Sequence, residues 1–156
     1  MPGPFGGCAQ PVFPLNCRGM DAFEHPEPGR RGETAVRVLV AFEDARGLYR
    51  EAIARALGEL RPNLQVRPAP LAELYRELCG FDPHVVVCSQ LNGEHPGARG
   101  AWVQVPTDDG ADDERLARMC LEGERWDTEG PTLGEILFVV DETRRRLRER
   151  RLAGTC

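Results

Sequence analysis

The sequence predicts an α/β fold in which helices cover both faces of a mainly parallel sheet. Two short apolar runs, Val36–Phe42, which is interrupted only by Arg37, and Val85–Cys88, are typical of strands that are buried on both faces. Between these runs the pattern changes to helical spacing, and strands that alternate with helices favour a parallel sheet. We therefore expect a three-layer α/β sandwich whose first three strands lie in the order 2-1-3, completed by an antiparallel pair and a C-terminal helix.

The first predicted strand leads directly into a pair of acids. Glu43 and Asp44 follow Phe42, and we interpret Asp44 as the N-cap of a helix over about 45–60. The short alternating segment 64–67 predicts a strand near the sheet edge, which the prolines after it close.

The middle of the chain predicts one more helix and three more strands. A helix over about 71–79 precedes the buried strand 85–88. Residues 90–100 contain Asn-Gly and Pro-Gly pairs, which are typical of a loop. Strands are then expected over 101–105 and 116–121. Only about ten residues separate these two strands, which favours an antiparallel pair because a parallel crossover needs a dozen or more.

The last predicted element is a helix with a clear start signal. Thr132 and Glu135 form a T-x-x-E capping box, and apolar residues recur after it at three- and four-residue spacing. Two favourable pairs are expected on its exposed side, namely Asp141–Arg145 and Glu142–Arg146.

We divide the chain into three parts by composition. Residues 1–34 hold six prolines and no periodic apolar pattern, so we expect a disordered tail. Residues 35–143 form the α/β domain, and residues 144–156 form an Arg-rich helix end and tail. We interpret the arginines as a solvated helix end. The alternative is contact with RNA or a partner, against which the acidic body of the chain argues.

Composition excludes several function classes. A net charge of -5 and a pI near 5.3 give no electrostatic reason to expect DNA or an anionic membrane as a partner. No apolar run approaches the ~20 residues of a membrane span, and the N-terminus has no signal-peptide pattern, so we expect a cytoplasmic protein. All 20 basic residues are Arg, which excludes a P-loop lysine and a Schiff-base lysine.

The six cysteines form no C-x-x-C pair, so a zinc ribbon or a thioredoxin-like site is not expected. Cys79, Cys88 and Cys120 lie in or beside apolar segments, and we interpret them as small core residues. Cys8, Cys17 and Cys156 lie in the tails, and we expect them to be free thiols in a reducing compartment.

The order of these features resembles the receiver domain of bacterial response regulators, which has a flavodoxin-like fold. In that family an acid pair after the first strand binds Mg²⁺, and an Asp at the end of the third strand accepts the phosphate. Glu43 and Asp44 match the acid pair. Counted from Pro83, the acceptor position falls on Ser89. The resemblance covers about residues 36–90.

The departures from the family pattern imply a degenerate receiver. The acceptor is Ser89, and a serine hydroxyl is a poor nucleophile without an adjacent base. The lysine that the family uses has no counterpart in a chain without Lys. The resemblance therefore implies a non-enzymatic signalling module with no catalytic residue and no required cofactor. It would act through contacts with a protein partner such as a histidine kinase or another signalling protein.

A second hypothesis uses the same residues as a cleft. Glu43, Asp44, Ser89 and Gln90 would lie together beyond the carboxyl ends of parallel strands, where ligands bind in open α/β sheets. The chain would then be a small-ligand-binding protein or an enzyme. Glu43 and Asp44 are also the candidate Mg²⁺ ligands, although two acids and a hydroxyl form a poorer set than three carboxylates.

Overall fold

The computed structural model describes residues 35–89, 100–106 and 116–153, with side-chain environments up to residue 150. Its strands form one mixed six-stranded sheet. The expected tail over 1–34 lies outside the described residues, as does the expected loop over 90–100 except for Gly100, so that Gln90 is also outside them.

The order of the elements follows the predicted alternation of strand and helix. The strands are β1 (Arg37–Phe42), β2 (Gln65–Pro70), β3 (Val85–Cys88), β4 (Ala101–Gln104), β5 (Ala117–Leu121) and β6 (Glu124–Thr128). The helices are α1 (Gly47–Leu60), α2 (Leu74–Gly80) and α3 (Leu133–Ala153), and short 3-10 turns, η1 (Asp44–Arg46) and η2 (Leu71–Glu73), precede α1 and α2.

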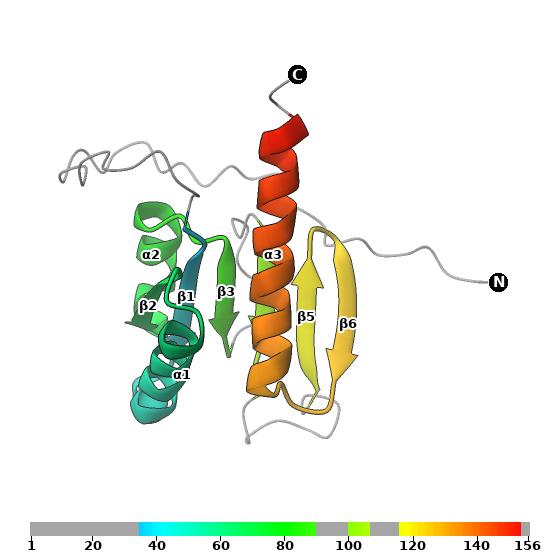
Figure 1. Cartoon of the computed structure of the whole chain (residues 1–156). Coiled ribbons are helices and arrows are strands. Elements are labelled where there is room, and N and C mark those ends of the chain that lie inside the picture. Colours follow the sequence, from blue (N-terminus) through cyan, green and yellow to red (C-terminus); the bar gives the residue numbers. More distant parts are fainter. Residues whose placement is uncertain (1–34, 90–99, 107–115, 154–156) are drawn as a thin grey trace.

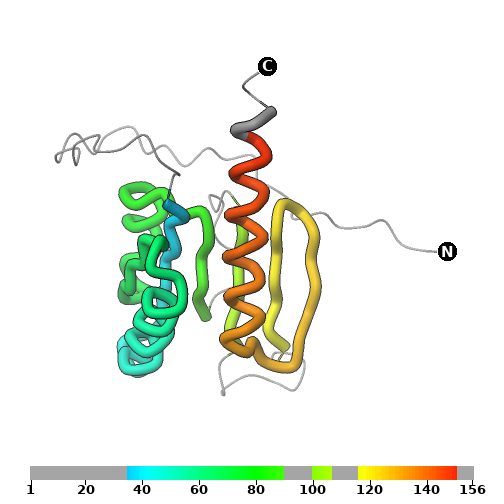
Figure 2. The backbone as a smooth tube through the Cα atoms, in the orientation of Figure 1, coloured from blue at the N-terminus to red at the C-terminus, as the bar shows by residue number. Residues whose placement is uncertain are grey.

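Helices pack on both faces of the sheet, so the α/β class is confirmed. On one face, α1 and α3 pack side by side over a core that includes Phe42, Leu57 and Val140 (Figure 1). On the other face, α2 covers a smaller core around Leu74 and Trp102. Figure 2 shows α3 as one continuous helix that runs alongside β5 and β6. Successive residues of β1, β3, β4 and β5 alternate between the two cores, because successive side chains of a strand point to opposite faces of the sheet.

The strand order is β2-β1-β3-β4-β5-β6, so the predicted order of the first three strands is found within a larger sheet. β1, β2 and β3 are parallel. β4 and β5 are antiparallel, as expected, but β4 also pairs parallel to β3 and extends the main sheet. β6, which the sequence analysis missed, pairs antiparallel with β5 and forms one edge.

Three local predictions have different outcomes. The capping box is confirmed, because Glu135 N–H donates to Thr132 Oγ1 at 3.2 Å and Thr132 N–H donates to Glu135 Oε2 at 2.8 Å. The N-cap prediction for Asp44 is wrong: it is the first residue of η1, and Arg46 precedes α1 without a side-chain cap. β2 continues through Pro68 and Pro70, which an edge strand tolerates because one side of its backbone needs no partner.

The interpretation of the cysteines needs a correction. Cys88 and Cys120 are buried in the core around Trp102, as expected, but Cys79 and Cys120 are both disulfide-bonded, which we did not expect. The tail cysteines Cys8, Cys17 and Cys156 lie outside the described residues. No helix in the described part of the chain is both long enough and apolar enough to span a membrane.

Candidate functional site

Three strands deliver polar side chains to one edge of the sheet. β1, β3 and β4 are parallel neighbours, with Ala41 opposite Cys88 and Cys88 opposite Gln104. Glu43 and Ser89 follow the ends of β1 and β3, and Gln104 is the last residue of β4. The register therefore places all three at the carboxyl ends of the strands, where sites in open α/β sheets form.

A direct hydrogen bond joins two of the predicted site residues. Ser89 Oγ donates to Glu43 Oε1 at 2.8 Å, and Ser89 is only 9% exposed. The other carboxylate oxygen of Glu43, Oε2, is buried and has no hydrogen-bond partner among the described residues. The side chain thus has one acceptor satisfied from within the fold and one that is not.

Asp44 does not share this contact. Its side chain is 89% exposed, and its Oδ1 lies 3.9 Å from Arg50 Nη1 as an ion pair. Arg50 is 14% exposed and is held in place by a 3.3 Å hydrogen bond from Nη1 to the Phe42 carbonyl oxygen. The acid pair therefore separates: Glu43 turns toward β3, while Asp44 faces solvent.

Two residues at this edge were missed by the sequence analysis. Gln104 Oε1 and Arg50 Nε are buried atoms that make no hydrogen bond within the part of the chain that the structure describes. Glu51 lies 3.5 Å from Arg50 Nε as an ion pair. Gln104 could have been predicted only if the strand over 101–105 had been placed parallel to β3.

The residues at the edge do not fit a magnesium site. Mg²⁺ requires several oxygen ligands in near-octahedral geometry. Glu43 offers one buried carboxylate oxygen, and Asp44 points to solvent beside a guanidinium group. Across the described ranges, no three acidic, His or Cys side chains are grouped closely enough to hold a metal ion.

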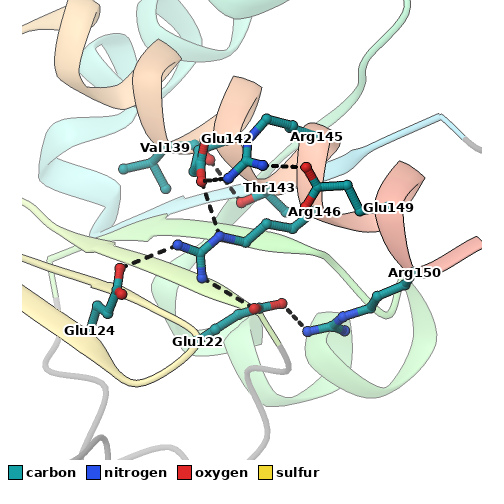
Figure 3. Close-up of polar contacts among 9 residues, drawn as sticks. All are labelled: Glu122, Glu124, Val139, Glu142, Thr143, Arg145, Arg146, Glu149 and Arg150. Atoms are coloured by element: carbon teal, nitrogen blue, oxygen red, sulfur yellow. Dashed lines mark hydrogen bonds and ion pairs between the residues drawn. The ribbon is translucent and has the colours of Figure 1, made fainter. Parts of the chain in front are cut away.

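The Arg-rich end of the chain is helical and largely paired with carboxylates (Figure 3). Arg146 Nε contacts Glu142 at 3.1 Å. Its Nη1 lies 3.2 Å from Glu122 and its Nη2 lies 3.2 Å from Glu124, both in the β5–β6 hairpin. Arg150 also contacts Glu122. These ion pairs hold the end of α3 against the hairpin. Guanidinium groups that are paired with carboxylates are less available to phosphates, which weakens the alternative of an RNA contact.

Two pKa shifts follow from the ion pairs of α3. Hydrogen bonds from Arg145 and Arg146 lower the pKa of Glu142 to about 2. The predicted pair of Asp141 with Arg145 is wrong. The two carboxylate oxygens of Asp141 instead accept hydrogen bonds from Arg61 Nε and Nη2 at 2.9 and 2.7 Å. The hydrogen bonds from Arg61 lower the pKa of Asp141. This contact ties the end of α1 to the middle of α3.

Comparison with known proteins does not assign this chain to a family. No protein-family model, no curated protein and no solved structure matches this chain. The class that the fold itself defines is a mixed α/β protein with one six-stranded sheet and a polar edge at the ends of β1, β3 and β4.

Proposed function

We propose that this chain is a degenerate receiver-like module with a flavodoxin-like core, which signals through protein–protein contacts and does not transfer phosphoryl groups. The observation that carries the proposal is the 2.8 Å hydrogen bond from Ser89 to Glu43. The acceptor position of a receiver then holds a hydroxyl that is engaged by the neighbouring carboxylate.

The charges at this edge also support the loss of phosphoryl transfer. A phosphoryl group carries negative charge, so a site for it needs cations aimed at it. The chain has no Lys, and one nearby cation, Arg50, is turned toward Phe42 and the acids Asp44 and Glu51. Glu43 Oε2, which accepts no hydrogen bond from the residues that the structure describes, would repel a phosphoryl group.

Apolar side chains beside the polar edge support a role in protein contact. Leu48 is 90% exposed and Tyr49 is 42% exposed, and both lie in the first turn of α1, directly after Asp44 and η1. Exposed apolar groups next to a polar rim are typical of surfaces that bind another protein. A histidine kinase or another signalling protein is the class of partner that we propose for this rim.

A melting experiment tests this proposal. The full chain is heated with and without Mg²⁺ and beryllofluoride, a mimic of an acyl phosphate, and we expect no change in Tm. Ser89→Asp is the matched control, since it restores three carboxylates; it should melt lower in EDTA and recover when Mg²⁺ is added. An increase of several degrees in the unmodified chain that Asp44→Ala abolishes would overturn the proposal.

A second candidate function is binding of a small ligand at the same edge. Glu43 Oε2 and Gln104 Oε1 are buried acceptors that lack a hydrogen-bond donor in the described regions. Such atoms are costly unless something donates to them. A ligand that carries an ammonium, guanidinium or amide group would supply donors, with Glu43 balancing a positive charge.

The two candidates separate in one screen. Small cationic and amide compounds are tested for stabilisation of the full chain, first alone and then against Glu43→Gln and Gln104→Leu. A hit that both substitutions abolish favours the ligand-binding function. Stabilisation that survives both substitutions argues against this edge as the binding site.

A further inference from the structure

The two edges of the sheet differ in their capacity to accept another strand. β2 forms one edge and contains Pro68 and Pro70, which carry no backbone N–H. Prolines on an edge strand are a device against pairing with other chains. β6 forms the other edge, and its sequence, Glu-Arg-Trp-Asp-Thr, contains no proline. Only the β6 edge therefore keeps its full set of backbone donors.

The turn before β6 determines which of those donors face outward. Glu122 and Gly123 have φ of 48° and 97°, and two positive φ values are characteristic of a type I′ hairpin turn. The residues that flank a two-residue turn form a hydrogen-bonded pair, and hydrogen-bonded pairs alternate along the ladder. With Leu121 opposite Glu124, the backbone groups of Arg125 and Asp127 then point away from β5.

The side chains of β6 are self-complementary about Trp126. If a second β6 runs antiparallel with Trp126 opposite its own copy, Arg125 lies opposite Asp127 of the other chain on both sides. These two pairs are the ones with outward-facing backbone groups, so each would exchange two hydrogen bonds. Arg125 and Asp127 are exposed, and Asp127 already lies across from Arg118 within its own chain. The second chain would continue this row of alternating charge.

An apolar surface adjoins the same edge. Trp126 packs edge-to-face on Phe138 of α3, with ring centroids 6.5 Å apart, and Phe138 is 59% exposed. Both rings line a hollow of about 330 Å³ whose rim includes Glu142 and Arg146. In a non-hydrogen-bonded antiparallel pair the opposing side chains come closest, so two Trp126 rings would meet there.

We infer that β6 is a homodimer interface, in which two copies of this chain pair antiparallel about Trp126 and join their sheets into one. We assign a second copy of this chain to the edge because an antiparallel β6 places each Arg125 opposite an Asp127, so the strand is complementary in charge to itself. Such an interface is isologous, as most dimer interfaces are. This inference does not depend on the proposed signalling function.

The mass of the full chain in solution tests the inference. Light scattering coupled to size exclusion, run over a range of concentrations, should give twice the 17.3 kDa chain mass at the upper end. Asp127→Arg sets two guanidinium groups opposite each other, and Arg125→Asp sets two carboxylates opposite each other, so each variant alone should be monomeric. Because both side chains are exposed, the variants should fold, which circular dichroism verifies.

Charge exchange makes the test specific. An equimolar mixture of Asp127→Arg and Arg125→Asp restores two opposite-charge pairs and should form a heterodimer. The chain that carries both substitutions also restores these pairs and should form a homodimer. Glu51→Arg makes the same change of charge as Asp127→Arg, but on α1 and away from β6, so this variant should remain dimeric. A monomeric mass for the unmodified chain at every concentration would overturn the inference, and so would a dimer that both single variants retain.

Discussion

Ser89 and Glu43, 46 residues apart in the sequence, share a hydrogen bond of 2.8 Å across the ends of two parallel strands. This bond satisfies the hydroxyl and one carboxylate oxygen, and it leaves Glu43 Oε2 buried with no donor from the described chain. The polar edge of the sheet is therefore built around an acid that the fold satisfies only in part.

Loss of the Ser89 hydroxyl should destabilise the fold. Ser89→Ala leaves both oxygens of Glu43 without a hydrogen-bond donor among the described residues, in a partly buried position, which costs about 1–3 kcal/mol. Urea unfolding should show a lower midpoint at an unchanged slope. Glu43→Gln is the matched variant, because its amide oxygen still accepts the hydrogen bond from Ser89 without a buried charge. Its urea midpoint should therefore fall less than that of Ser89→Ala. Equal midpoints for Ser89→Ala and the unmodified chain would refute this account of the bond.

The ion pairs of Glu142 predict a loss of stability in acid. Hydrogen bonds from Arg145 and Arg146 lower its pKa from 4.5 to about 2 in the folded chain. The unfolded chain therefore takes up the proton first, so the stabilisation is complete above pH 4.5 and is lost as the pH falls toward 2. The carboxyl signal of Glu142 in an NMR titration reports this pKa directly.

Removal of one donor should reverse part of this shift. In Arg146→Gln the pKa of Glu142 should move back toward 4.5, while Arg55→Gln on α1 should leave it unchanged. A Glu142 that titrates at 4.5 in the unmodified chain would show that the pairs do not form in solution.

Gly100 should not tolerate a side chain. Its φ is +134°, and a Cβ added there would lie 2.4 Å from the His84 carbonyl oxygen, which also accepts a hydrogen bond from Ala101 N–H. Gly100→Ala should therefore cost about 1–3 kcal/mol or more. Gly58→Ala is the matched control in α1, where an added Cβ has nothing within 4 Å, and it should stabilise by about 0.5–1 kcal/mol. Thermal unfolding of both variants checks the contrast; similar Tm values would contradict it.

The sequence predicted the elements whose burial is continuous or periodic. β3 is apolar throughout, and β1 is apolar after Arg37, because helices cover both faces of these strands. Parallel pairing of the two strands was then enough to bring Glu43 and Ser89 to one edge. β6 was missed because four of its five residues are polar and only Trp126 packs against the core. An edge strand of this kind is held by backbone pairing, which leaves little periodic signal.

Long-range pairing accounts for the remaining differences. Helical spacing identifies partners three and four residues apart, so it found Glu142–Arg146. It could not find the contact of Asp141 with Arg61, which depends on how α1 and α3 pack. Gln104 was missed for a similar reason, because its place in the site depends on the parallel pairing of β4 with β3.

An NMR titration tests the central proposal most directly, because it reports on the edge residues themselves. Mg²⁺ and beryllofluoride are added to the ¹⁵N-labelled chain, and the amide signals of Phe42–Asp44 and Cys88–Ser89 are followed. We predict that these signals stay in place, because Ser89 is bonded to Glu43 and provides no acceptor for a phosphoryl mimic. Saturable shifts at these amides that Asp44→Ala abolishes would contradict the account.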